Sequence, residues 1–399
     1  MIIVENADRI DRELRHELAG IWYISDQYGA KILVKLPSSS IKAILKGCLI
    51  ELLFAVDGGL NPNILLSGLR VYDDSVHPQL LMNSVQHQKD HFAIVKIMHL
   101  GKVQVQFCNE LNAIQSFGDL HISEKDRHNV LCLMGNPKRF YTGQDFGHLY
   151  RSLDKFQAVL NKEASFKHNN LIDISVKGTY KQVESIKHSY VGAEQTVNTN
   201  IENPLEGEQL EKEIYVVLRS LFAKDAYHNP LIKSKTGYRE LIDIFAISEF
   251  GVFLIEAKAL GVYESVDGRT MERKVLGLQK QIKKAVTQLV GASKTIADGT
   301  KIFSTPDKEL LFERKLFPHG IVLISEMFHF GDWNSIIRLI INTMAECKMF
   351  VHVMDLQEML QFIGYSNNDK NIFDDLLMQR VKRFVEHPTL HVRSQFYEK

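Results

Sequence analysis

Residues 241–260, LIDIFAISEFGVFLIEAKAL, place three charges inside two apolar runs that are predicted to be the strands of a hairpin. Side chains alternate along a strand, so Asp243 shares a face with apolar residues of the first run, while Glu256 and Lys258 share one face of the second. An antiparallel sheet with one face in water would tolerate such charges. The apolar length of both runs favours burial instead, and a buried charge is costly unless it is paired or binds a metal.

The two acids and the lysine together suit metal-dependent hydrolysis. Asp243 and Glu256 lie on neighbouring strands, so we expect their carboxylates to be close, and Mg²⁺ or Mn²⁺ prefers oxygen ligands. Lys258 can position or activate a water and offset charge on a phosphate, while a metal polarises that phosphate. The alternative is a structural ion pair, which leaves two acids against one base and is expensive without a metal.

The same residues carry a resemblance to a known family. Asp243 followed by Glu256-Ala257-Lys258 resembles the D-x(n)-E-x-K signature of the PD-(D/E)XK nuclease superfamily, and LIDIF with GVFLIEAK is similar to its nuclease-related domain (NERD) group. The resemblance covers roughly residues 203–365. It implies an α/β fold with a restriction-endonuclease-like αβββαβ core and a mixed central sheet.

The resemblance also implies an acid on the first core helix, in a GxxxE setting. GEQLE offers Glu211, four residues after Gly207, with Glu208 as the other option. Glu211 is favoured because Ile214 and Leu218 follow it at helical spacing.

On the second core helix the resemblance implies a glutamine or lysine. Gln288 is the first choice, with Gln281 and Lys284 next. The metal-ligand set of the family implies a backbone carbonyl between Glu and Lys, here that of Ala257, beside Asp243 and Glu256.

Length and composition predict the arrangement of the rest. The 399 residues suggest two or three domains. We expect an N-terminal α+β domain over residues 1–165, a polar linker over 166–203 and the nuclease-like domain over 204–399. The N-terminal domain would serve in sensing, oligomerisation or target recognition.

The sequence also predicts the secondary structure of particular segments in both halves. Residues 40–56 are predicted to be a helix, and residues 91–100 and 226–234 to be strands. His87 and His91, four residues apart, could form half of a metal site on one helical turn, but no third ligand is near and surface histidines are favoured.

Charge is balanced overall, with 48 basic and 48 acidic residues, but residues 269–301 hold eight basic residues and two acids. Such a surplus either attracts phosphate backbones or is a solvated helix face.

The four cysteines are scattered, which predicts neither a disulfide framework nor a zinc site and suits a cytoplasmic, reducing compartment. Residues 43–56 are too short and too charged to span a membrane, and the N-terminus lacks a signal-peptide pattern.

These observations predict a Mg²⁺- or Mn²⁺-dependent endonuclease that cleaves DNA. The resemblance implies a role in bacterial restriction or anti-phage defence, with repair or recombination as the alternative. A homo-oligomer is expected, because cutting both strands of a duplex needs two sites. Two alternatives remain: a catalytically inactive nuclease fold that binds nucleic acid or a protein, and a scaffold in which the hairpin forms a subunit interface.

Overall fold

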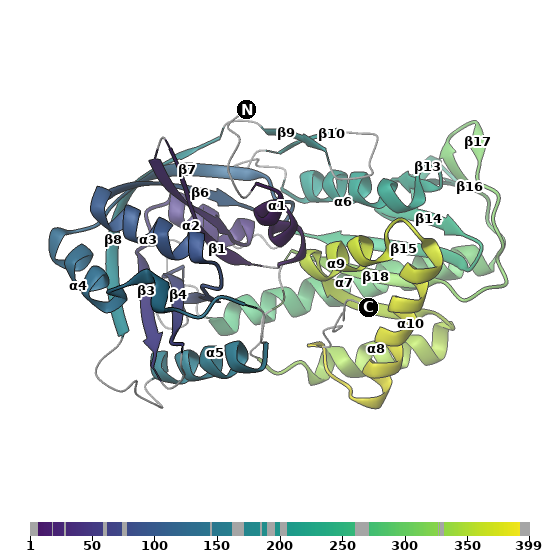
Figure 1. Cartoon of the computed structure of the whole chain (residues 1–399). Coiled ribbons are helices and arrows are strands. Elements are labelled where there is room, and N and C mark those ends of the chain that lie inside the picture. The colour runs from purple at the N-terminus through teal and green to yellow at the C-terminus, as the bar shows by residue number, and fades with distance from the viewer. Residues whose placement is uncertain are drawn as a thin grey trace. The chain divides into compact units, whose positions relative to one another are not determined.

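The computed structural model describes residues 7–17, 19–27, 29–58, 62–73, 78–143, 146–161, 171–183, 186–189, 196–199, 206–259, 271–325, 327 and 331–391. The chain forms two compact units, residues 1–186 and 187–399, and both mix helices with strands (Figure 1). A mixed α/β architecture is therefore confirmed. Arg269 and much of the predicted linker lie outside the described residues.

The first unit is built on one mixed sheet with the strand order β1-β2-β6-β7-β8-β3-β4-β5. Its strands are β1 (Gly20–Asp26), β2 (Gly29–Lys35), β3 (Ile50–Asp57), β4 (Ile64–Val71), β5 (Gln79–Ser84), β6 (Lys102–Cys108), β7 (Ile114–His121) and β8 (Leu171–Gln182). Its helices are α1 (Ala7–His16), α2 (Ser38–Leu45), α3 (Gln88–Leu100), α4 (Glu124–Met134), the 3₁₀ turn Pro137–Arg139 and α5 (Phe146–Leu160).

Two predictions for this unit are wrong. The expected helix over 40–56 ends at Leu45, because Gly47 adopts φ 89°, and the chain then enters β3. The expected strand over 91–100 is instead helical and makes up all but the first three residues of α3. Its buried residues, Ala93, Ile94, Ile97 and Met98, recur at the helical period and not at the strand period.

Part of the segment predicted as a linker belongs to the first sheet. Residues 171–182 form β8, which pairs with both β3 and β7. The segment is polar because β8 exposes alternate residues such as Asp173 and Ser175, a pattern that composition alone does not separate from a linker.

The second unit contains a five-stranded mixed sheet with the order β11-β14-β15-β18-β19 and a four-stranded side sheet with the order β13-β12-β16-β17. The strands are β11 (Ala226–His228), β12 (Leu231–Ser234), β13 (Gly237–Glu240), β14 (Ile244–Ser248), β15 (Gly251–Lys258), β16 (Ile302–Thr305), β17 (Lys308–Glu309), β18 (His319–Ile324) and β19 (Phe350–Asp355). A short pair, β9 (Ile186–Ser189) and β10 (Thr196–Thr199), precedes them.

Helices cover both faces of the five-stranded sheet. They are α6 (Glu206–Phe222), α7 (Met271–Ala297), α8 (Asn334–Cys347), α9 (Leu356–Ser366) and α10 (Lys370–Glu386). On one face, Leu254 and Val322 share a buried core with the apolar side of α7. On the other face, Phe253 packs against Phe222 of α6 and Phe373 of α10, with ring centroids 5.1 and 5.8 Å apart.

A second hairpin, long and bent, precedes the charged hairpin and shares β14 with it. Residues 226–234, expected to be one strand, divide into β11 in the five-stranded sheet and β12 in the side sheet. The returning strand divides in the same way into β13 and β14, so one hairpin spans two sheets. Asp243 lies just before β14 and not inside it. Helix α8 and the strands of the side sheet beyond β12 were not expected.

No helix in the described part of the chain combines the length and the apolar character needed to cross a bilayer.

A buried ion pair joins the last helices of the second unit to its sheet. The guanidinium of Arg380 donates from Nε to Glu358 Oε1 over 3.0 Å and from Nη2 to the Val353 carbonyl over 2.6 Å, and both charged side chains are only 4% exposed. Arg380→Ala leaves the Glu358 carboxylate buried without its cation. We expect it to lower the free energy of unfolding by about 3–5 kcal/mol in urea denaturation.

Lys382→Ala removes an exposed cation from the same helix and serves as the control. Replacing both partners, as Arg380→Met with Glu358→Leu, should recover most of the loss, because no unpaired charge then remains buried. Equal stabilities of Arg380→Ala and Lys382→Ala would contradict this account.

Candidate active site

The structure brings Asp243, Glu256 and Lys258 together where β14 begins and β15 ends. The two strands are antiparallel, and Ile244 faces Ile255, so the next pair outward is Asp243 and Glu256. Lys258 Nζ lies 2.5 Å from Glu256 Oε2 and 3.6 Å from Asp243 Oδ2. The single ammonium group of Lys258 therefore forms ion pairs with both carboxylates.

Asp243 is held in place by the backbone of the opposite strand. Its Oδ2 accepts a hydrogen bond of 2.8 Å from the Ala257 N–H, the residue between Glu256 and Lys258. This contact fixes the carboxylate of Asp243 against the E-x-K segment, because an N–H donor and an ionised acceptor form a strong hydrogen bond.

A β-bulge sets the direction of Asp243. The Asn229 N–H donates to the Asp243 carbonyl and the Leu241 N–H donates to the Pro230 carbonyl, both over 2.9 Å. Asn229 and Pro230 are adjacent, whereas Ile242 intervenes between Leu241 and Asp243. The second strand thus carries one extra residue, which is the definition of a bulge and bends the hairpin at this point.

Gln288 of α7 completes the hydrogen bonding of Glu256. Its Nε2 donates to Glu256 Oε1 over 2.6 Å, and its Oε1 is buried with no hydrogen-bond partner among the described residues. Gln281 and Lys284, the other two choices on this helix, are exposed. The packing of α7 thus brings Gln288 to the carboxylates.

Burial and charge shift the pKa of the central groups. The Glu256 side chain is 1% exposed. Its burial, with the adjacent Asp243, raises its pKa to about 8 despite the opposing effect of Lys258. The pKa of Lys258 is also raised, because the attraction of Glu256, Asp243 and Glu211 outweighs the opposing effect of its burial, which is the largest single cause. The site holds two acids that resist joint ionisation unless further positive charge is present.

Of the two candidate acids on α6, Glu211 contributes to the electrostatic field that raises the pKa of Lys258, and Glu208 does not. Glu211 Oε2 lies 3.7 Å from His228 Nε2, a buried nitrogen without a hydrogen-bond partner in the described part of the chain. Glu208 is exposed and forms an ion pair with Lys212 over 2.6 Å. The geometry therefore favours Glu211.

Sequence reasoning did not single out His228 and Asn229. His228 lies at the end of β11 beside Ile244 and 3.7 Å from Glu211, and Asn229, with φ 49°, donates its N–H to Asp243. The Asn-Pro dipeptide at 229–230 is the sequence signal from which this break in the strand could have been predicted. Asparagine tolerates a positive φ, and proline has no N–H for the ladder, so together they mark a break in a strand.

The donor atoms fit a hard divalent cation. The described residues contain no group of three His, Cys, Asp or Glu side chains arranged to hold a metal. The candidate oxygen donors are instead the carboxylates of Asp243 and Glu256, and the resemblance adds the Ala257 carbonyl to them. Mg²⁺ is commonly held by one or two carboxylates and keeps several waters, so these residue types are compatible with such an ion. The unpartnered Gln288 Oε1 adds an acceptor beside Glu256 for such a water.

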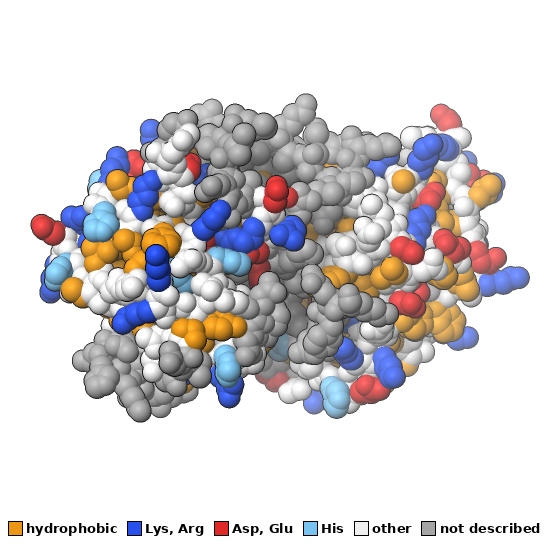
Figure 2. All heavy atoms as spheres, in the orientation of Figure 1, with side chains coloured by type: hydrophobic (Ala, Val, Ile, Leu, Met, Phe, Trp, Pro, Cys, Tyr) orange, Lys and Arg blue, Asp and Glu red, His pale blue; other side chains and the backbone are white. Residues whose placement is uncertain are grey.

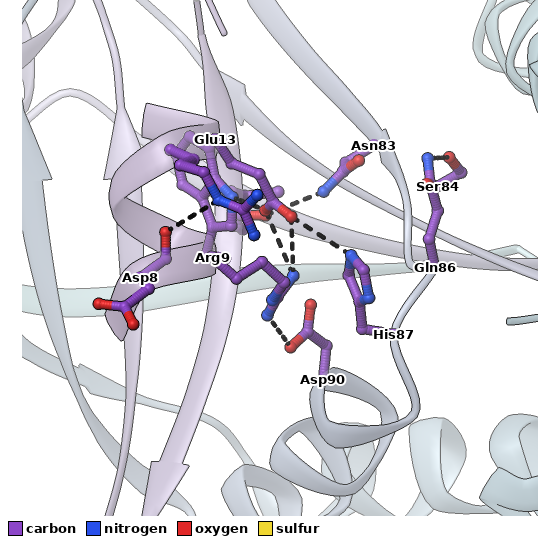
Figure 3. Close-up of polar contacts among 11 residues, drawn as sticks. Asp8, Arg9, Glu13, Asn83, Ser84, Gln86, His87 and Asp90 are labelled. Carbon is purple, nitrogen blue, oxygen red and sulfur yellow. Dashed lines mark hydrogen bonds and ion pairs between the residues drawn. The ribbon is translucent and has the colours of Figure 1, made fainter. Parts of the chain in front are cut away.

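The histidine pair of the first unit has a different role. His91 is fully buried and its Nε2 lies 2.8 Å from the Val85 carbonyl, so it is not a surface histidine as predicted. His87 Nε2 lies 3.3 Å from Glu13 Oε1. Figure 3 shows Glu13 between His87 and Arg9, with Arg9 also reaching Asp90 over 2.6 Å. These contacts join α1 to the start of α3.

Comparison with protein families identifies one part of the chain. Residues 206–311 match the model of the nuclease-related domain (NERD). This stretch is therefore similar to a nuclease-related domain. It contains Glu211, Asp243, Glu256, Lys258 and Gln288, so the resemblance predicted from the sequence is confirmed there. No significant match to a curated protein or to a solved structure accompanies it.

The pKa of Glu256 predicts a pH-dependent stability of the metal-free protein. Between pH about 4.5 and about 8 the folded state keeps a proton on Glu256 that the unfolded state releases, so rising pH lowers the free energy of unfolding. Glu256→Gln removes this slope. We expect its melting temperature to exceed that of the wild type increasingly as pH rises towards 8, measured by differential scanning fluorimetry in EDTA.

Glu272→Gln, an exposed acid in the first turn of α7, is the matched control. Adding Mg²⁺ at pH 8 should stabilise the wild type and the control but not Glu256→Gln, because only the first two retain the carboxylate pair. Identical pH profiles for the wild type and Glu256→Gln would contradict the assignment of a buried, proton-retaining carboxyl.

Proposed function

We propose that the second unit is a metal-dependent nuclease that hydrolyses phosphodiester bonds of DNA. The observation that carries the proposal is the convergence of Asp243, Glu256, Lys258 and Gln288 within one nuclease-related domain. The element order α6, β11, β14, β15, α7, β18 supports a restriction-endonuclease-like αβββαβ core. On this view the side sheet and α8 are additions to that core.

The proposed division of labour follows from the contacts. Asp243, Glu256 and the Ala257 carbonyl would hold Mg²⁺ or Mn²⁺, which would polarise the phosphate and acidify a bound water. Lys258 holds positive charge beside both carboxylates and is placed to stabilise the phosphate as negative charge develops on it. Gln288 orients Glu256 through its Nε2, and Glu211 adds negative charge on the side of α6.

The geometry also allows a second function. Both oxygens of Glu256 accept hydrogen bonds, from Lys258 and from Gln288, as in a satisfied structural ion pair. A catalytically inactive domain that binds nucleic acid or a protein partner would have this arrangement too. The proposal also includes wider roles. The nuclease would serve in restriction, anti-phage defence, repair or recombination. The first unit would serve in sensing, target recognition or oligomerisation.

Cleavage assays distinguish the two functions. With Mg²⁺ and a panel of supercoiled, linear duplex and single-stranded DNA and RNA, we expect the wild type to cut DNA. Glu256→Ala and Lys258→Ala should each lose about 10²–10⁴-fold in rate, because each removes a group that acts at the reacting phosphate.

Glu249→Ala, an exposed acid in the turn of the same hairpin, should cleave like the wild type. If the wild type and all variants are equally inert on every substrate, the domain is a binding module.

Asp243→Asn tests whether the hairpin is instead a scaffold or a subunit interface. The asparagine Oδ1 can still accept from the Ala257 N–H, so the fold should survive while one metal-binding charge is lost. We expect the oligomeric state in sedimentation velocity to be unchanged and Mg²⁺-dependent cleavage to fall at least about 100-fold. A variant that dissociates but still cleaves would support the interface.

A further inference from the structure

A row of cations on α7 leads away from the candidate active site. Arg273, Lys280 and Lys284 are exposed, and none has a hydrogen bond or ion pair with any residue in the described ranges. We call these three residues the α7 stripe. Gln288, which contacts Glu256, lies on the same helix at the end of the stripe.

Helical periodicity places the stripe on one side of α7. At about 100° per residue, the three cations fall within an arc of about 80° that begins at Gln288. At about 1.5 Å per residue, Lys284, Lys280 and Arg273 follow Gln288 at about 6, 12 and 22 Å along the axis. The opposite side of the helix is fixed in the core by a buried apolar set: Val275, Leu278, Ile282, Ala285 and Leu289.

The charge on this part of α7 is unbalanced, unlike the chain as a whole. Residues 271–287 carry five basic residues and one acid, Glu272. On the face of the second unit seen in Figure 2, by contrast, basic and acidic side chains are interspersed. A linear array of unpaired cations is complementary to a linear polyanion, because binding releases the counterions of the polyanion.

We propose that the α7 stripe binds the sugar-phosphate backbone of DNA and guides it to Gln288 and Glu256. The inference rests on the proposed function and names the surface that the substrate uses. The stripe spans about 17 Å, which is the length of about five phosphates on one strand of a duplex. Lys284 is therefore assigned to substrate binding and not to catalysis.

The experiment separates binding from cleavage. The full chain carrying Glu256→Gln binds a fluorescein-labelled DNA duplex, and fluorescence anisotropy is recorded over a series of NaCl concentrations. Lys280→Ala with Lys284→Ala is compared with Lys283→Ala with Lys294→Ala. Both pairs remove two exposed lysines from α7, but Lys283 and Lys294 lie outside the arc of the stripe, about 60° and about 40° beyond Lys280 around the helix.

The stripe pair should weaken binding by at least about ten-fold at low salt and reduce the slope of log K against log salt by about 1.8, which is 0.9 for each phosphate contact. The control pair should change the affinity less than two-fold. Circular dichroism should show both pairs folded, because all four side chains are exposed. If both pairs weaken binding equally, or if neither does, the stripe is not the binding surface.

The two proposals fail in different ways. In the otherwise wild-type protein, we expect the stripe pair to raise KM for cleavage with little change in kcat, because its residues contact the backbone and not the scissile phosphate. A wild type that never cleaves, but binds DNA through the stripe, overturns the proposed function alone. A wild type that cleaves, with KM unchanged in the stripe pair, overturns the stripe alone.

Discussion

The arrangement of the second unit depends on the burial of Glu256 next to Asp243 with only one lysine between them. Two neighbouring carboxylates that are largely buried from solvent are unstable when both are ionised. The fold therefore either keeps a proton on Glu256 or provides room for a cation. Lys258 and Gln288 each satisfy one oxygen of Glu256, and the Ala257 N–H satisfies Asp243. This arrangement costs stability while no cation is bound, as expected of the proposed ion site.

The bent hairpin allows the Asp243 carboxylate to contact the segment that carries Glu256 and Lys258. Its inner half, β11 and β14, is part of the five-stranded sheet, while its outer half, β12 and β13, belongs to the side sheet. The bulge at Ile242 lies at the bend, and the positive φ of Asn229 lies opposite. A straight hairpin would continue the alternation of side chains past Asp243. The bend instead ends the regular strand there and leaves the carboxylate free to turn towards the Ala257 N–H.

Several features of the site follow from the sequence, because they depend on local rules. Strand alternation and the short connection at 249–250 place Asp243 opposite Glu256 and put Lys258 on the same side. Other expectations failed for equally physical reasons. Apolar runs at 43–56 and 91–100 satisfy more than one periodicity over a short window, and Gly47 or the position of the buried face decides between them. The exposed alternate residues of β8 give a strand of the first sheet the composition of a linker.

The sequence by itself determined which acids and which lysine lie together on the two strands of the charged hairpin, since these are set by residue type and a period of two. Only the tertiary structure distinguished the position of Gln288 from those of its neighbours Gln281 and Lys284, and the position of Glu211 from that of Glu208. All of these are polar residues on amphipathic helices. Which turn of a helix faces a given strand depends on how its apolar side packs, and that packing involves residues far apart in the chain.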